Sequence, residues 1–321
     1  MRGGLDLGGT KIQAVVLDEN DEVVGKSRRP TPGEGGPPAV VEALAEALGE
    51  AASDAGIELG AVVGVGLGSP GAVDAKAGTV ADARNIAEWP DFPYPMAAEL
   101  GKRVGAPVAL GNDVQVGVEA EYELGAAKDD RSLLGVFWGT GVGGGIILDG
   151  KPWLGRGAAG EIGHMVVERD GALCPCGRRG CMEAYAGRGA MEQEARRLVE
   201  LGRETVLFEI MEERERTRLQ SGIWHRALKR DDELAVELIE RALAALGAGI
   251  ASAINLLDVE TVVIGGGLGT RLGEAYVSRI EDAMLPHLFV SERPPAVRLA
   301  ALGDLGGAIG AALLGGRRDV P

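Results

Sequence analysis

Short apolar runs separated by turn residues open the chain and predict antiparallel strands joined by tight turns. The first runs lie at 5–7, 12–17 and 23–24, with Gly8-Gly9-Thr10 and Asn20-Asp21 between them. The same pattern returns at 133–138 and 146–148, with a glycine-rich turn over 139–145 and Asp149-Gly150 after the last run. The two halves of the chain therefore begin with the same predicted supersecondary structure.

Helical periodicity and buried apolar strands alternate through the rest of the chain, which predicts an α/β fold. The predicted helices cover about 38–56, 114–124, 188–201, 205–214 and 231–257, and the predicted strands cover 62–67, 108–110 and 259–264. We expect an N-terminal lobe over 1–115 and a C-terminal lobe over 116–303. A final helix, about 304–316, has small residues on most faces and is expected to pack back onto the first lobe.

Composition narrows the class of protein. Apolar residues make up 45% of the 321 positions and charged residues 25%, which is ordinary for a globular enzyme with more than one core. The net charge of −15 opposes binding to the phosphate backbone of nucleic acid, although backbone N–H groups and a metal can still bind a small anion such as ATP. No apolar run is long enough to span a membrane and no signal peptide is recognisable, so we expect a cytoplasmic protein.

The first glycine turn carries candidate phosphate-binding groups. In the run from Asp6 to Lys11, a carboxylate ends the strand, Gly8 and Gly9 form the turn, and Thr10 and Lys11 follow. Backbone N–H groups of such a turn can bind phosphate oxygens while Asp6 holds Mg²⁺ through water. The alternative is a structural hairpin whose glycines merely supply positive φ angles.

Two further glycine clusters extend this interpretation. Gly139-Thr140-Gly141-Val142-Gly143-Gly144-Gly145 holds more glycines than a hairpin needs, since each costs about 0.5–1 kcal/mol in conformational entropy. Gly265-Gly266-Gly267 follows a buried strand, where an adenine and ribose could approach, although such a triplet is also a common helix start. No Walker motif is present, so we expect ATP to be held by paired glycine loops.

The pair Asn112-Asp113 lies where a predicted strand gives way to a helix. Phosphoryl transfer asks for a carboxylate that orients and deprotonates the acceptor alcohol, and Asp113 is the candidate. The alternative is that Asp113 is only a helix N-cap.

A cysteine-rich segment predicts a metal site. All three cysteines, Cys174, Cys176 and Cys181, lie close together after His164, with spacing His-x9-Cys-x-Cys-x4-Cys. Three thiolates and one imidazole complete a tetrahedral structural zinc site, whereas three buried free thiols are the alternative. Glu161 and Glu183 flank this segment and could bind the hydroxyls of a polyol, or they could be ordinary surface glutamates.

Together these motifs resemble the ROK family (repressors, open reading frames and sugar kinases), and within it the bacterial glucokinases. The resemblance spans nearly the whole chain and also includes Ser69-Pro70-Gly71, Asn85-Ile86 and Trp89. It implies a duplicated ribonuclease-H-like fold of the actin and hexokinase type, with two lobes and a cleft between them. It also implies ATP and Mg²⁺ as cofactors and a homo-oligomer, a dimer or tetramer.

The resemblance assigns roles to individual residues. Asp113 becomes the general base for the 6-hydroxyl of glucose. The sugar-binding residues become Gly71, Asn85, Asn112, Asp113, Glu161, His164 and Glu183. The ATP-binding residues become Asp6, Gly8, Gly9, Thr10, Lys11, Gly139, Thr140, Gly141, Gly143 and Gly265 to Gly267. His164 is then expected to serve both sugar and zinc, with one ring nitrogen for each.

Three other functions stay open. The family also contains kinases for other hexoses and for N-acetylmannosamine, which share much of the motif set. It contains sugar-responsive repressors, but these carry a helix-turn-helix domain before the first glycine turn, and here that turn begins at Asp6. A catalytically silent sugar-binding protein is the third, although Asp113 and the two phosphate loops argue against it.

Overall fold

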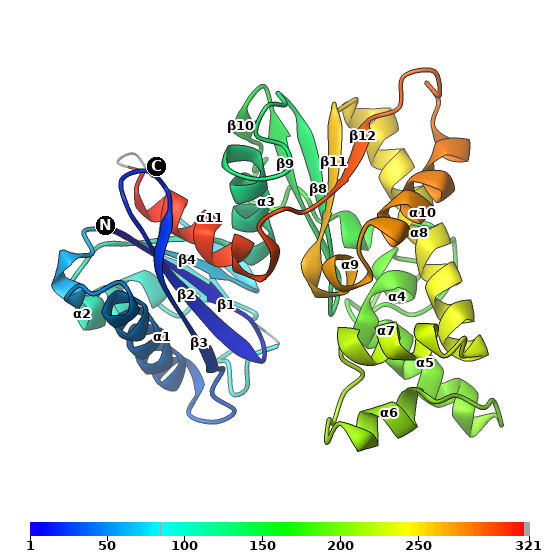
Figure 1. Ribbon diagram of the computed structural model, residues 1–321, viewed down its shortest axis with the longest axis horizontal. Coiled ribbons are helices and arrows are strands. Elements are labelled where there is room, and N and C mark those ends of the chain that lie inside the picture. Colours follow the sequence, from blue (N-terminus) through cyan, green and yellow to red (C-terminus); the bar gives the residue numbers. More distant parts are fainter. Residues whose placement is uncertain (84, 318–321) are drawn as a thin grey trace. The chain divides into compact units, whose positions relative to one another are not determined.

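The apolar runs fold into two five-stranded sheets that share one topology, as seen in a computed structural model that describes residues 1–83 and 85–317 (Figure 1). The chain divides into two compact units. Unit 1 contains residues 1–125, 155–157 and those from 304 onward, and unit 2 contains 126–154 and 158–303. Each unit has its own apolar core of buried side chains.

The sheet of unit 1 has the strand order β3-β2-β1-β4-β7. Its first three strands are antiparallel, while β4 and β7 run parallel to β1. The strands are β1 (Arg2–Leu7), β2 (Lys11–Leu17), β3 (Val23–Pro30), β4 (Val65–Ser69) and β7 (Val108–Asn112). A separate hairpin pairs β5 (Ala72–Asp74) with β6 (Thr79–Ala81).

The sheet of unit 2 repeats this arrangement in the order β10-β9-β8-β11-β12. Again three strands are antiparallel and two run parallel to the central one. The strands are β8 (Leu133–Trp138), β9 (Val142–Leu148), β10 (Lys151–Pro152), β11 (Thr261–Gly265) and β12 (Ala296–Leu299). The repeated topology confirms the predicted duplicated fold of the ribonuclease-H type.

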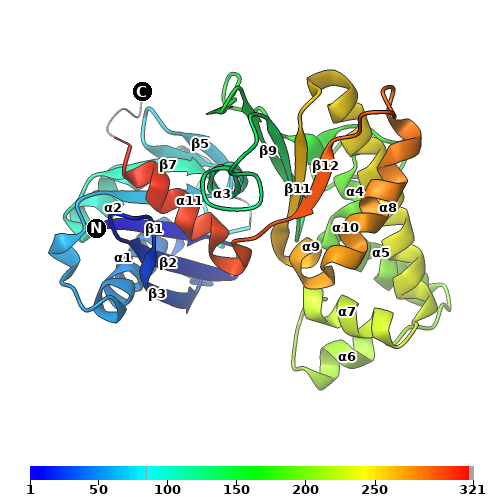
Figure 2. The ribbon, with the colours of Figure 1, turned by 45° about the horizontal axis from the view of Figure 1, so that its top comes forward.

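Helices cover both faces of the unit 1 sheet. Adjacent residues of β1 show this directly, because a side chain on Gly3 would meet Leu48 of α1 and one on Gly4 would overlap the backbone of α11. Figure 2 shows α11 lying beside α3, which it contacts extensively. The helices are α1 (Gly36–Asp54), α2 (Met96–Val104), α3 (Asp113–Glu123) and α11 (Gly306–Gly315), with short 3-10 turns η1 (Leu59–Ala61) and η4 (Gly303–Leu305).

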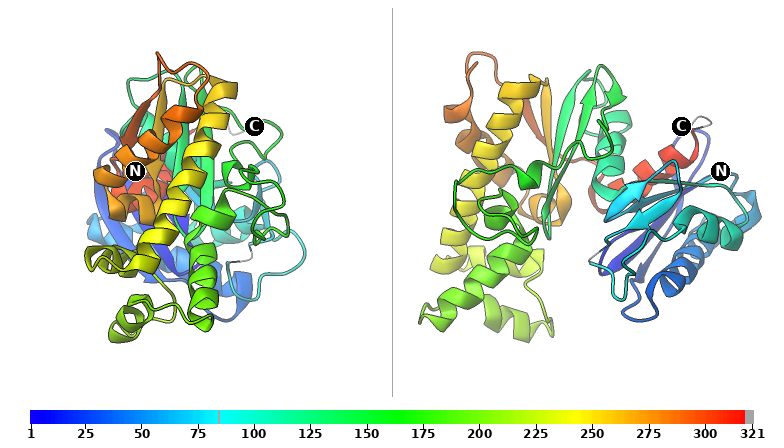
Figure 3. Two further views of the ribbon diagram at one scale, coloured as in Figure 1. Left: turned by 90° about the vertical axis from the view of Figure 1, so that its right-hand side faces the viewer. Right: turned by 180° about the vertical axis from the view of Figure 1, so that it is seen from behind.

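Unit 2 is richer in helices, and the long α8 runs beside α10 (Figure 3). Its helices are α4 (Glu183–Ala186), α5 (Arg188–Glu200), α6 (Leu207–Glu213), α7 (Ser221–Lys229), α8 (Glu233–Leu257), α9 (Gly266–Leu272) and α10 (Glu274–Met284). The 3-10 turns are η2 (Ile162–His164) and η3 (Leu285–His287). Among the described residues, no helix is long and apolar enough to cross a membrane.

Two glycine-rich segments have different bounds in the structure from those that the sequence predicted. The turn predicted over 139–145 ends at Gly141, because Gly143, Gly144 and Gly145 pair with β8 inside β9. A Cβ on Gly144 would lie 2.7 Å from the Gly160 carbonyl oxygen, so glycine there permits close packing of a neighbouring segment. Gly265 to Gly267 likewise form no loop, and the alternative that this triplet is a helix start is confirmed, since β11 passes directly into α9 at Gly266, whose φ is 79°.

The sequence pattern also left several elements unpredicted. These are α2, α7, α10, β12 and the β5–β6 hairpin. The strands among them have only three or four residues, too few for a clear period, whereas α2, α7 and α10 are as long as helices that the pattern did predict.

Candidate functional site

The carboxyl ends of the parallel strands in unit 1 gather several predicted site residues. Ser69 at the end of β4 pairs with Asn112 at the end of β7, and Asp6 lies near the end of β1. Gly71 follows β4 at φ 89°, and a side chain there would overlap the carbonyl oxygen of Ala81. Because parallel strands end at one edge of the sheet, the fold brings these residues together.

The first glycine turn is held by backbone contacts. The Gly8 nitrogen donates to the Lys11 carbonyl oxygen at 2.9 Å, and the Thr31 hydroxyl donates to the Gly8 carbonyl oxygen at 2.6 Å. Neither Gly8 nor Gly9 has a positive φ, so the alternative that these glycines merely supply positive φ is wrong. Gly9 instead permits close approach, since a Cβ there would lie 2.9 Å from the Asn85 carbonyl oxygen.

Asp6 is surrounded by charged groups of unit 1. Burial, and then the negative charge of Asp113, raises the pKa of Asp6 to about 7, while the Lys11 ammonium acts in the opposite direction. Lys11 Nζ lies 3.3 Å from a carboxylate oxygen of Asp304. A Cβ on Gly307 would lie 2.8 Å from the carboxyl carbon of Asp6, so the start of α11 packs against this group. Clustered carboxylates of this kind are the ligands that Mg²⁺ prefers.

Asn112, and not Asp113, caps helix α3. Its side-chain oxygen accepts hydrogen bonds from the backbone nitrogens of Val114 and Gln115, each at 3.1 Å. The capping alternative therefore applies to the neighbouring residue, and Asp113 is the first residue of the helix. These two hydrogen bonds also fix the orientation of the Asn112 side chain, and with it the direction in which its amide nitrogen can donate.

The second glycine turn lies in unit 2 and is bound to two helices. The Thr140 hydroxyl accepts from Arg188 Nη2 at 2.7 Å, and the Val142 nitrogen donates to Glu183 Oε2 at 2.8 Å. A Cβ on Gly139 would lie 3.8 Å from the Gly267 nitrogen, so the turn and the start of α9 are neighbours. A side chain on Gly141 would overlap the Glu183 carboxylate, which explains the glycine there.

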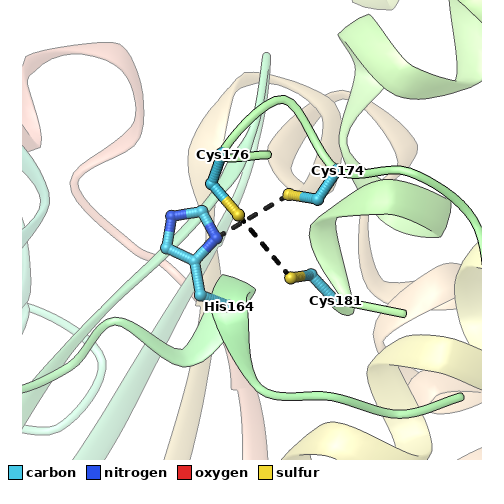
Figure 4. A group of neighbouring side chains, drawn as sticks. All are labelled: His164, Cys174, Cys176 and Cys181. Carbon is cyan, nitrogen blue, oxygen red and sulfur yellow. Dashed lines mark hydrogen bonds between the residues drawn. The ribbon is translucent and has the colours of Figure 1, made fainter. Parts of the chain in front are cut away.

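The predicted metal ligands converge in unit 2, as Figure 4 shows. The ligand atoms of His164, Cys174, Cys176 and Cys181 all lie within 4.8 Å of one another. The Cys176 and Cys181 sulfurs are 3.8 Å apart, and the Cys174 sulfur lies 3.9 Å from Nδ1 of His164. Sulfurs of a tetrahedral zinc site are about 3.8 Å apart. The donor set and these distances fit a metal ion of that class.

Thiol acidity differs within this cluster. Burial raises the pKa of Cys174 to about 12. Burial also acts to raise the pKa of Cys176, but hydrogen bonds to its sulfur from the Arg178 backbone and the Cys174 thiol lower that pKa to about 7. Cys176 thus offers a thiolate near neutral pH, the form that binds a metal.

His164 and Glu183 connect the cysteines to the rest of the unit. With Nδ1 of His164 facing Cys174, Nε2 faces the Glu161 carboxylate at 3.8 Å. Glu183 Oε1 lies 3.9 Å from the Cys174 sulfur, while its other oxygen accepts from the Val142 nitrogen. Glu183 therefore joins the metal cluster to the second glycine turn, a contact that the sequence did not indicate.

Two charged residues near the predicted site escaped the sequence analysis. Asp304 precedes the glycine-rich start of α11 and pairs with Lys11, and Arg188 begins α5 and binds Thr140. An acidic residue before a glycine-rich helix and an arginine after Gly187 are the signals that could have indicated them.

Comparison with known proteins gives a consistent result. The model of a family described as the ROK family matches residues 2–317. The chain is 33% identical to a glucokinase of Streptomyces coelicolor over 98% of both chains. It is 32% identical to an N-acetylmannosamine kinase of Haemophilus influenzae, over 96% of this chain and 93% of the other. The structure of a ROK family glucokinase from Streptomyces griseus in complex with glucose and AMPPNP superimposes with a TM-score of 0.83, at 32% identity over 98% of both chains.

Proposed function

Since the chain belongs to the ROK family, and its relatives include sugar kinases, we propose that it transfers the terminal phosphoryl group of ATP to the 6-hydroxyl of glucose. The observation that carries the proposal is the carboxylate pair of unit 1. Asp6 pairs with Gly68 of β4, and a Cβ on Gly68 would lie 3.3 Å from the Cα of Asp113 at the start of α3, so the two carboxylates belong to the same edge of the sheet. Kinases use one carboxylate to orient the acceptor hydroxyl and acidic side chains to hold the metal ion.

Asp113 acts as the general base in this proposal. It accepts the proton of the 6-hydroxyl as the sugar oxygen attacks the terminal phosphorus, and the bond between that phosphorus and ADP breaks. Asn112 orients the same region, because its capping hydrogen bonds hold its amide in place. Gly71 and Asn85 contribute backbone and side-chain contacts to the sugar.

The phosphates of ATP are bound by the two glycine turns. Gly9 and Thr10 offer backbone N–H groups in unit 1, Gly8 shapes the turn by donating its own N–H to the Lys11 carbonyl oxygen, and Lys11 adds a positive charge. In unit 2, Thr140 and Gly141 serve in the turn that the Gly139 nitrogen closes by donating to the Gly141 carbonyl oxygen, Gly143 lies beside it in β9, and Gly265 to Gly267 lie near the nucleoside. Bound Mg²⁺ would neutralise phosphate charge, and Asp6 is the residue that would hold it, directly or through water.

Zinc has a structural role in the proposal. The ligands would be His164, Cys174, Cys176 and Cys181, which leave no open position for a reacting water. The ion would fix the orientation of His164, whose second nitrogen then binds the sugar together with Glu161 and Glu183.

N-acetylmannosamine is the second candidate acceptor, because a relative of that name is nearly as similar as the glucokinases. The two candidates share Asp113 and both turns, so they differ only in contacts around the sugar ring.

A coupled assay of ADP release tests the function. The intact protein is supplied with ATP, Mg²⁺ and, separately, glucose, mannose, fructose, allose and N-acetylmannosamine, and kcat/KM is measured for each. We expect the highest value for glucose. A higher value for another sugar would replace the acceptor and keep the mechanism, and sugar binding without any turnover would contradict a kinase.

A further inference from the structure

Arg188 and its neighbour Gly189 are bound to the second glycine turn by three hydrogen bonds. Its Nη2 donates to the Thr140 hydroxyl at 2.7 Å, and its backbone nitrogen donates to the Gly139 carbonyl oxygen at 3.2 Å. The next nitrogen, that of Gly189, donates to the Thr140 carbonyl oxygen at 2.9 Å. The start of α5 and the turn therefore form one local structure inside unit 2.

The guanidinium of Arg188 has no carboxylate partner within ion-pair distance in the described part of the chain. The nearest candidate, Glu192, is already engaged by Arg196, Arg218 and the Leu219 nitrogen. Burial lowers the pKa of Arg188, and the charge of Arg218 adds to this effect while Glu192 opposes it. The half-buried Arg188 guanidinium, held by Thr140 and without a carboxylate at ion-pair distance among the described residues, is therefore available to an anionic ligand.

A second guanidinium lies beside the first. Arg218 Nη2 would lie 3.9 Å from a Cβ on Gly189, and its side chain is 64% exposed. The first turn of α5 also carries the partial positive charge of a helix N-terminus. The Arg188 guanidinium and the Thr140 hydroxyl thus lie at the Gly139–Gly141 turn, and Arg218, which pairs with Glu192, lies farther out beside Gly189.

We propose that Arg188 binds the terminal phosphates of the nucleotide donor at this turn, with Thr140 beside it and Arg218 as a weaker outer contact. The proposal rests on the function proposed above and adds to it a residue that discriminates between nucleotides by their number of phosphates. Arginine suits this task, because its planar fork donates two parallel hydrogen bonds to a phosphate. The Thr140 contact holds that fork in place before the nucleotide arrives.

A nucleotide series separates phosphate contacts from every other effect. Adenosine, AMP, ADP and ATP are titrated calorimetrically into the intact protein, its Arg188→Gln variant and its Arg188→Lys variant. Arg197→Gln is the matched control, since Arg197 lies on the same helix and pairs with Glu194 instead.

We expect adenosine to bind all four proteins equally. ATP should bind Arg188→Gln roughly tenfold to a hundredfold more weakly than the wild type, the range of a charge-assisted hydrogen bond. Arg188→Lys should recover part of this loss, because it keeps the charge without the fork. Arg197→Gln should behave as the wild type.

Three results would overturn the inference. They are an unchanged ATP affinity in Arg188→Gln, an equal loss of adenosine and ATP affinity, which would indicate a collapsed turn, and a wild type whose affinity does not rise from adenosine to ATP. The kinase assay keeps the two proposals apart. Turnover of a sugar with an unchanged KM for ATP in Arg188→Gln would reject the inference alone, whereas the expected binding series without any turnover would reject only the kinase.

Discussion

At the scale of single residues, two carboxylates of unit 1 meet different requirements. In the proposed mechanism Asp113 accepts a proton from an alcohol while being the first residue of its helix and not its N-cap, with Oδ1 also accepting from the Val114 nitrogen at 3.0 Å. Asn112 makes this possible by taking the cap itself. The proposal assigns the cation to Asp6, whose pKa is raised to about 7 by burial and by the charge of Asp113, so without a cation this carboxylate tends to bind a proton.

Replacing Asp113 by Asn should lower kcat by about a hundredfold to ten-thousandfold, the usual contribution of a general base. The dissociation constant for glucose should change little, because Asn keeps the size and the hydrogen-bonding capacity of the side chain. Steady-state kinetics and sugar titration measure the two quantities. A variant that turns over at the wild-type rate would reject Asp113 as the base.

The raised pKa of Asp6 predicts a pH dependence of stability. The folded protein keeps a proton on Asp6 up to about pH 7, whereas the unfolded chain loses it near the ordinary value of 3.8. Between these values the folded state binds more protons, so its stability falls as pH rises and levels off above pH 7. Urea unfolding without Mg²⁺ should show this fall relative to Asp6→Asn between pH 5 and 7. A constant difference between the two proteins over that range would contradict the prediction.

At the scale of elements, glycine and alanine let α11 pack backbone to backbone in unit 1. A side chain on Gly66 of β4 would overlap the Ala311 carbonyl oxygen, and one on Gly310 of α11 would overlap the Val116 carbonyl oxygen of α3. The helix therefore approaches both the sheet and α3 more closely than larger residues permit. Its start in turn packs against Asp6, so this close packing supports the candidate site.

Gly310→Ala tests this packing. The new methyl group cannot move a backbone carbonyl without shifting a helix, so we expect a loss of about 1–3 kcal/mol in the free energy of unfolding. Gly49→Ala is the control, since Gly49 is also inside a helix but a Cβ there meets nothing within 4 Å. The control should gain about 0.5–1 kcal/mol. If urea unfolding shows the same change in free energy of unfolding for both variants, helix propensity alone accounts for the effect of Gly310→Ala.

The predicted metal-binding segment, residues 164–181, also leads to a testable expectation. Because one nitrogen of His164 faces the cysteines and the other faces Glu161, loss of the ion should release both contacts. We expect Cys176→Ser to lose zinc and to weaken sugar binding by about tenfold to a hundredfold, as expected when an orienting partner is removed. Metal analysis and sugar titration provide the readouts, with chelation and zinc re-addition to the wild type as control. Zinc-free protein with normal sugar affinity would contradict this coupling.

At the scale of the whole molecule, each unit buries its own core. Unit 1 packs β1, β2 and β4 against α1, and unit 2 packs β8 and β11 together with α5 to α10. The same sheet topology occurs in both units, and only the helices and loops added to it differ. Separate cores allow each unit to unfold as its own cooperative block. The homo-oligomer expected from the family resemblance stays a prediction for sedimentation analysis.

Calorimetry of the intact protein should therefore resolve two transitions. Gly310→Ala should lower the one that belongs to unit 1, because that residue packs against α3. Zinc chelation should lower the other, because all four proposed ligands lie in unit 2. If both treatments shift one common transition, the units unfold together.

The sequence by itself determined the features that depend on neighbours along the chain. The duplicated strand openings, the glycine turn after Asp6 and the short segment from Cys174 to Cys181 were all predicted, since spacing and local conformational preference specify them. The four predicted metal ligands converge in the structure for the same reason, because three of them lie on one tight loop.

Only the tertiary structure decided the contacts between distant segments. The pairing of Lys11 with Asp304, the attachment of Arg188 to Thr140 and the extension of β9 through Gly143 all depend on packing. Residues far apart in the sequence meet only after sheets and helices have buried their apolar faces. The spacing of residues along the chain does not predict these contacts, because burial depends on the whole fold and not on any one segment.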